Sequence, residues 1–241
     1  MKQYSLIPLT LTLAICFQAV ASAPIIRLNT TGQPPLNTPK QTGFMDEVAA
    51  EAFRRIGYQL KTTRLPAERG LKSSNQGHID GEMSRIKGLN KNYTNLLRVP
   101  ENIMEWHFVA FSYKPIDLSK GWNTLSGKSV SYINGWKILE NNIPSYAEII
   151  KTTNSTDLFT LLRRMRADYI IYERWGGIYL LRKMAIKNVK ICKPALAVKK
   201  MFIYLHKDHK SLVPRLAKAL STMKKDGSYQ KLVKKHLTPL E

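Results

Sequence analysis

The chain has 241 residues and a formal net charge of +21, and 44% of its residues are hydrophobic, enough to bury one or two ordinary cores. The positive charges are dispersed and no nucleic-acid-binding module is recognisable, so we expect no nucleic-acid partner. A solvated basic surface is the simplest interpretation of the charge. Attraction to anionic wall polymers or membrane, and steering of acidic ligands, are the alternatives.

The first 23 residues, MKQYSLIPLTLTLAICFQAVASA, combine Lys2, an apolar run and a small-residue ending. This pattern is typical of a secretory signal peptide with cleavage after Ala23, so we expect a periplasmic protein. An uncleaved membrane anchor and a lipoprotein attached at Cys16 are the alternatives. Only Cys192 remains in the mature chain, which excludes an internal disulfide framework, and we expect its thiol to be a small buried hydrophobe.

The first part of the mature chain follows a β-α-β-α-β order. Strands are predicted at 24–32, 58–66 and 78–83, and helices at 44–57 and 67–77. The Pro- and Gly-rich segment 32–43 has no apolar period and predicts an exposed loop. This order favours an α/β layer built on a mostly parallel sheet.

A second α/β rhythm follows an extended aromatic segment at 96–113 and a loop-rich boundary at 114–128. It contains predicted strands at 129–135, 146–152, 168–173, 189–194 and 201–207, and helices at 136–143, 155–167 and 176–186. Two C-terminal helices, 212–225 and 229–237, end the chain. Extended connections near 108–114 and 200–207 predict two lobes with a cleft between them. Lobe 1 comprises 24–113 and 200–241, and lobe 2 comprises 114–199.

Ligands of open α/β sheets bind beyond the carboxyl ends of the strands. The positions expected to face the cleft are therefore 29–32, 66–69, 83–85, 132–135, 154–156 and 172–174.

Six stretches carry a family resemblance: TGFMDEVAAEAFRRIGY, LPAERGLKSSNQGHIDGEMSR, NLLRVPENI, LSGKSVSYINGWKI, NSTDLFTLLRRMRADYIIYE, and the ending that starts at MFIYLHKDH. Their order and spacing resemble a divergent branch of the bacterial extracellular solute-binding proteins of family 3, the amino-acid-binding type. The resemblance implies a type II periplasmic binding fold. It also implies a clamp that closes on a small polar solute and delivers it to an ABC transporter permease or a sensor. We expect a monomer without a cofactor or metal.

Arg85 is the first candidate for a ligand contact, with Ser84 beside it. In better-known members of the family, a Ser/Thr-x-Thr-x-x-Arg segment clamps an α-carboxylate at this point, whereas this chain reads GEMSRIKGLNKNYTN. Arg85 matches that arginine by position, and a guanidinium suits a carboxylate or phosphate. The alternative is an internal ion pair with Glu82 or Glu101. Arg69, at the start of a helix, is a second anion candidate, or else a surface residue paired with Glu68.

Five further positions complete the lobe 1 and lobe 2 candidates. Trp106 and Tyr132 are expected either to stack on a ligand or to pack in the core. The N–H groups of the turn at Gly135 suit an anion, and Asn154 is a ligand candidate or a helix cap. Glu173 ends a strand that ends in a ligand-binding Asp in relatives, so the resemblance implies a contact with a ligand amine. Its alternative is an ion pair with Arg174 or Arg85.

The leading hypothesis for function is a periplasmic solute-binding protein without catalytic activity. It captures a small polar, carboxylate-bearing solute, an amino acid or a related compound. The first alternative is a periplasmic dehydratase of the cyclohexadienyl or arogenate type on the same fold, with Glu173 as the acid. The second alternative is a wall or membrane interaction protein held by surface charge.

Overall fold

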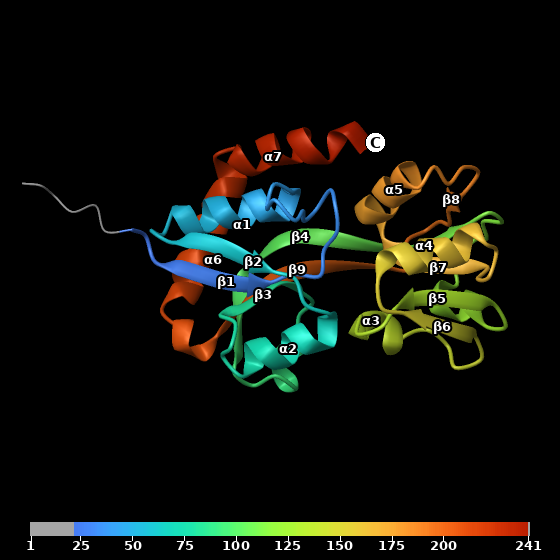
Figure 1. The fold of residues 1–241 in the computed structure, drawn as a ribbon, viewed down its shortest axis with the longest axis horizontal. Coiled ribbons are helices and arrows are strands. Elements are labelled where there is room, and N and C mark those ends of the chain that lie inside the picture. Colours follow the sequence, from blue (N-terminus) through green and yellow to red (C-terminus); the bar gives the residue numbers. More distant parts are fainter. Residues whose placement is uncertain (1–21, 241) are drawn as a thin grey trace, which may run out of the picture.

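A computed structural model describes residues 22–240 of the chain, so the predicted signal peptide lies outside the described residues except for its last two. One mixed sheet runs through the whole described chain, in the strand order β2-β1-β3-β9-β4-β7-β5-β6 with β8 beside β4 (Figure 1). The strands are β1 Ile25–Asn29, β2 Gln59–Thr63, β3 Gly81–Arg85, β4 Leu96–Ser112, β5 Ser129–Ile133, β6 Glu148–Thr152, β7 Tyr169–Glu173, β8 Lys190–Ile191 and β9 Ala197–His206.

The helices agree with the predicted ranges apart from a few residues at their ends. They are α1 Phe44–Arg54, α2 Ala67–Asn75, α3 Lys137–Glu140, α4 Ser155–Arg163, α5 Arg174–Lys183, α6 Leu212–Lys225 and α7 Ser228–His236. The apolar face of α1 is fully buried, because Phe44, Val48, Ala49, Ala52 and Phe53 recur at helical spacing and pack in the core. None of the helices in residues 22–240 has the length and hydropathy needed to cross a bilayer.

Two groups of elements flank the long strands β4 and β9. One contains β1, β2 and β3 with α1, α2, α6 and α7, and the other contains β5 to β8 with α3, α4 and α5 (Figure 1). Within the groups, β1 pairs in parallel with β2 and β3, and β5 with β6 and β7. The antiparallel pair β4 and β9 runs from one group into the other. This is the predicted two-lobed α/β fold. The division at 113/114 and 199/200 stays a prediction, and its second point falls inside β9.

The loop 32–43 corrects one expectation, because its middle is not exposed. Leu36 is 2% exposed and Asn37 is fully buried. The Asn37 amide donates to Asp46 Oδ1 at 2.6 Å, and its carbonyl oxygen accepts from Thr30 Oγ1 at 2.9 Å. Asp46 also accepts from the backbone N–H groups of residues 38 and 43. A polar residue can therefore be buried here because each of its groups is satisfied.

Cys192 is a free cysteine and is 1% exposed, as the sequence predicted. Burial raises the pKa of its thiol, which keeps the thiol neutral and unreactive.

Candidate functional site

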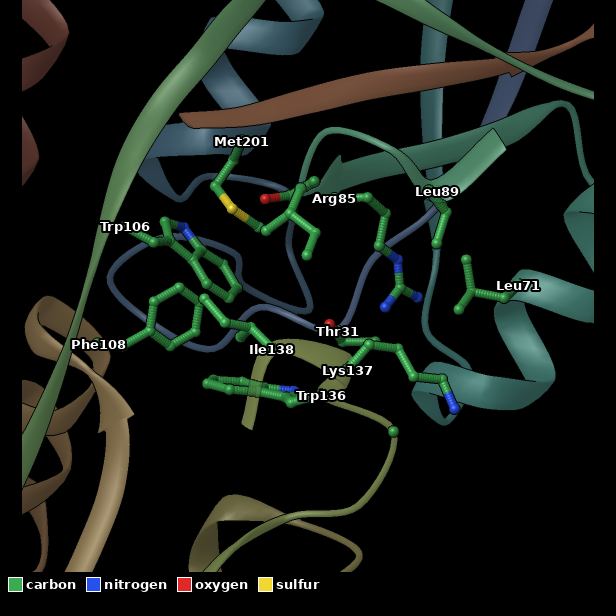
Figure 2. A pocket seen from close by; sticks show the side chains of 13 residues that line it. Thr31, Leu71, Arg85, Leu89, Trp106, Phe108, Trp136, Lys137, Ile138 and Met201 are labelled. Atoms are coloured by element: carbon green, nitrogen blue, oxygen red, sulfur yellow. The ribbon is translucent and has the colours of Figure 1, made fainter. Parts of the chain in front are cut away.

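A small cavity lies between the two lobes, where β3, β4 and α2 of one lobe face the turn from β5 into α3 of the other (Figure 2). Its volume is about 50 Å³, and a buried water needs roughly 10–15 Å³ of such space, so it holds a few waters at most. The lining residues are Thr31, Leu71, Ser84, Arg85, Ile86, Leu89, Trp106, Phe108, Gly135, Trp136, Lys137, Ile138 and Met201.

Arg85 lines this cavity and also makes the internal ion pair that was its alternative. It is the last residue of β3, opposite Phe202 of β9, so it lies inside the strand and not after it. Its Nε donates to Glu82 Oε2 at 2.7 Å, and Nη2 donates to the carbonyl oxygen of Ala67 at 3.1 Å. Among the described residues, Nη1 has no hydrogen-bond partner, and Figure 2 shows the guanidinium directed into the cavity.

Glu82 holds Arg85 in this orientation from within the core. Its carboxylate is 1% exposed and accepts from Asn29 Nδ2 at 3.1 Å, from Ser74 Oγ at 3.0 Å and from the Arg85 guanidinium. An arginine anchored through two of its nitrogens loses little further freedom when the third meets a ligand, so this pair orients Arg85 in advance.

Two further hydrogen-bonding groups in the cavity wall have no partner. The indole Nε1 of Trp106 and the hydroxyl of Ser84 are both buried, and neither bonds to any residue in the described part of the chain. Both residues belong to the lining. An unsatisfied buried polar group costs about 1–3 kcal/mol, so structures normally pair such groups with protein, water or a ligand. The cavity wall therefore contains unused hydrogen-bonding groups, and Figure 2 shows the Trp106 indole across the cavity from the Arg85 guanidinium.

Aromatic rings form the apolar side of the cavity. Trp136 stacks on Tyr172 with ring centroids 4.9 Å apart, and it also contacts Trp106 at 5.4 Å and Phe108 at 5.9 Å. Trp106 is 4% exposed, so it combines both roles considered for it, packing against rings and lining the cavity. Neither Trp136 nor Phe108 was a predicted ligand contact, although Trp136 directly follows the predicted turn at Gly135.

The lobes touch along the rim of the cavity. Lys137 Nζ of α3 lies 3.0 Å from Glu68 Oε2 of α2 and 3.2 Å from Glu140 Oε2. Tyr93 also donates to Glu68 Oε1, at 3.1 Å. The hydrogen bond from Lys137 holds the pKa of Glu68 below its ordinary value, which keeps this interlobe pair ionised.

Gly135 lies close to Ala67 and Glu68 of the opposite lobe. A Cβ at this position would lie 3.0 Å from the Cβ of Ala67, and the backbone φ of +84° already requires glycine. Its N–H donates to Glu140 Oε1 at 2.9 Å, so this amide, expected to receive an anion, is used internally.

Three other predicted residues are not among those that line the cavity. Tyr132 is 2% exposed and packs in the core, with Lys151 Nζ 5.8 Å from its ring centroid. Arg69 is exposed on α2. Asn154 accepts the N–H of Asp157 at 2.9 Å and caps α4, which was its alternative role.

Glu173 does not line the cavity either. It is 1% exposed, and its two carboxylate oxygens accept the N–H groups of Trp175 at 3.0 Å and Gly176 at 2.8 Å, which makes it the N-cap of α5. Burial raises its pKa to about 7. A pKa near 7 would suit an acid catalyst, but both carboxylate oxygens accept hydrogen bonds from the first N–H groups of α5. The ion pairs considered for it, with Arg174 or Arg85, are absent from the hydrogen bonds and ion pairs of the described residues.

Comparisons with known proteins agree with the fold. An uncharacterized protein of Shewanella oneidensis is 26% identical over 238 residues, which span 91% of this chain and 89% of the relative. No protein-family model matches the chain.

Solved structures are similar at lower identity. A GluR0 ligand-binding core in complex with L-glutamate has a TM-score of 0.78 at 14% identity and covers 90% of this chain and 100% of its own. The substrate-binding protein of an amino acid ABC transporter has a TM-score of 0.73 at 18% identity, covering 88% and 99%. A histidine kinase sensor domain similar to periplasmic binding proteins has a TM-score of 0.72 at 15% identity, covering 89% and 96%. These likenesses confirm the type II periplasmic binding fold.

Proposed function

We propose that this protein is a periplasmic solute-binding protein that captures a small carboxylate-bearing solute between its two lobes. One observation carries the proposal: the unpartnered Trp106 Nε1 and Ser84 hydroxyl line the same interlobe cavity as the free nitrogen of Arg85. A carboxylate presents about four lone-pair sites and accepts several such bonds at once. The cavity is small because the lobes touch, so a solute enters when they separate and is enclosed when they close.

The fold supports delivery of the bound solute to another protein. Proteins of this fold include the substrate-binding protein of an amino acid ABC transporter and a histidine kinase sensor domain. We propose either an importer or a sensor as the partner, with a monomeric binding protein in the periplasm. A dehydratase is not proposed, because the acid it would use, Glu173, caps a helix with both oxygens.

The test is a thermal-shift screen of small metabolites on the mature protein, followed by calorimetric titration of each compound that raises the melting temperature. A ligand that binds only the folded state stabilises it in proportion to its concentration over its Kd. We expect carboxylates to dominate the compounds that stabilise the protein.

The same titration with Trp106→Phe assigns the binding site. This change removes the indole donor and keeps an aromatic ring, and a hydrogen bond to a charged acceptor contributes about 1.5–3 kcal/mol, so we expect binding about tenfold weaker or more. Trp122→Phe is the matched control, since Trp122 is half-buried and is not part of the cavity lining. If no compound stabilises the protein, or if the two variants bind equally well, the proposal is wrong.

A further inference from the structure

The described side chains that line the cavity supply groups for a carboxylate but include no acidic group to balance an amine. Its described lining contains the cation Arg85 and the unpartnered groups of Trp106 and Ser84, but no Asp or Glu. The ammonium of an α-amino acid has three N–H donors, and burying it without acceptors is costly. Ser84 and Thr31 offer hydroxyl oxygens, which accept a hydrogen bond but do not balance a charge.

The carboxylate behind the cavity cannot fill this role. Glu82 is buried, and it already accepts from Asn29, Ser74 and Arg85. A ligand ammonium could reach Glu82 only by displacing the Arg85 guanidinium. An amino acid would then gain a partner for its ammonium by breaking the ion pair that orients Arg85 toward its carboxylate.

The carboxylates at the rim are also engaged. Glu68 bonds to Tyr93 and pairs with Lys137, while Glu140 accepts from the Gly135 N–H and pairs with the same lysine. Figure 2 shows the Lys137 side chain running along the cavity with its amine directed away from Trp106. The rim thus closes through ion pairs between the lobes, and Glu68 Oε2, which accepts no hydrogen bond among the described residues, is neutralised by Lys137 at 3.0 Å.

The rest of the wall is apolar. Leu71, Ile86, Leu89, Ile138 and Met201 line it together with the aromatic rings. Sites of this composition bind the hydrocarbon body of a ligand and use a few polar groups to orient it. The net charge of +21 acts in the same direction at long range, since it attracts a monoanion and has no net pull on a zwitterion.

We infer that the solute is a small carboxylic acid with a short aliphatic body and no α-amino group. This inference rests on the proposed function and specifies its ligand class. The carboxylate would meet Trp106 Nε1 and the Ser84 hydroxyl, and Arg85 would face it from the other side of the cavity. The hydrocarbon body would lie against Trp136, Ile138 and Met201.

The experiment compares acids with their own α-amino counterparts on the wild-type mature protein. The pairs are propionate with alanine, butyrate with 2-aminobutyrate and isobutyrate with 2-aminoisobutyrate, each titrated by calorimetry at one ionic strength. Inorganic phosphate serves as an anion without a hydrocarbon body. We expect the best acid to bind at least about tenfold more tightly than its amino acid, and more tightly than phosphate. Trp106→Phe should weaken that binding, while Trp122→Phe should not.

The outcomes separate the two proposals. An amino acid that binds as tightly as its acid or more tightly overturns the inference and leaves solute capture standing. The same holds if no acid of the series binds but a solute of another class does so in a Trp106-dependent way. If no solute of any class binds, the proposed function fails, and the inference fails with it.

Discussion

Gly135→Ala should weaken solute binding by obstructing closure of the lobes. In the closed structure, the added methyl would sit 3.0 Å from the Cβ of Ala67 on the opposite lobe. Carbon atoms in contact prefer a separation of about 3.5–4.0 Å, so the lobes would have to separate slightly or Ala67 would have to move. Once the lobes are apart, this contact is gone. The substitution therefore raises the free energy of the closed state relative to the open state.

The magnitude has two parts, and a second glycine separates them. Alanine in a left-handed conformation costs about 1–2 kcal/mol, and this strain applies whether the lobes are open or closed. Overpacking costs about 1–3 kcal/mol and applies only to the closed state. Gly57 has the same φ of +84° and no atom within 4 Å of its added Cβ, so Gly57→Ala carries the strain without the contact.

The assay is calorimetric titration of both variants with the same solute, together with their melting temperatures. We expect both variants to lose similar stability without ligand. Gly135→Ala should also bind about five- to hundredfold more weakly, since about 1.4 kcal/mol corresponds to a factor of ten. Equal affinity of the two variants would refute the claim that binding requires this closed contact.

Three other predictions follow from single interactions. Arg85→Lys keeps a cation for Glu82 but removes the planar guanidinium, so solute binding should weaken about tenfold. Arg85→Ala leaves the buried carboxylate of Glu82 unpaired, which costs about 3–5 kcal/mol of stability. The lysine variant should therefore lose less stability than the alanine variant. Unchanged affinity in the lysine variant by calorimetry would exclude Arg85 as a ligand contact. Glu68→Gln removes the interlobe ion pair with Lys137, in which both side chains are about 40% exposed. Because exposed ion pairs contribute little and are screened by salt, solute affinity should fall only a fewfold and should depend less on salt concentration. A loss of affinity beyond tenfold would show that this ion pair is not a weak surface interaction. Glu173 has a folded pKa of about 7 against an ordinary 4.5, so between these values the unfolded chain releases a proton that the folded chain retains. The free energy of unfolding should therefore fall by up to about 3 kcal/mol as the pH rises through this interval and level off above it. Denaturant unfolding of Glu173→Gln should lack this pH dependence. If the pH profiles of the two proteins run parallel, the burial of Glu173 has no such effect.

The order of the elements was predictable because it depends on local apolar spacing. The predicted helix at 44–57 appears as α1, and the predicted extended segment at 96–113 appears as β4. In each case the spacing of the apolar residues favours one type of secondary structure over the other. The exposed-loop expectation for 32–43 was wrong because composition does not reveal that Asn37 finds a buried partner in Asp46.

The candidate site was predictable only in part. Placing ligand contacts at strand ends identified Ser84, Arg85 and Gly135, and Trp106 was chosen as an aromatic residue that could stack on a ligand. All four line the cavity. The same rule also selected Glu173, because a strand end followed by a helix suits a ligand contact and a helix cap equally well, and only the tertiary structure separates the two. Lys137 was missed because its importance depends on Glu68 of α2 lying opposite it. Trp136 was missed because its ring partners Trp106 and Phe108 come from a distant strand, β4.

The indole N–H resonance of Trp106 tests the central claim most directly. The chain has four tryptophans, so heteronuclear NMR resolves a small set of indole signals, and the Trp106→Phe and Trp122→Phe variants assign two of them. On titration with the tightest-binding acid, the Trp106 signal should move downfield and become protected from hydrogen exchange, because its unpartnered Nε1 then donates to a carboxylate. The Trp122 signal should stay in place. A solute that binds while the Trp106 signal remains unchanged would contradict the proposed site.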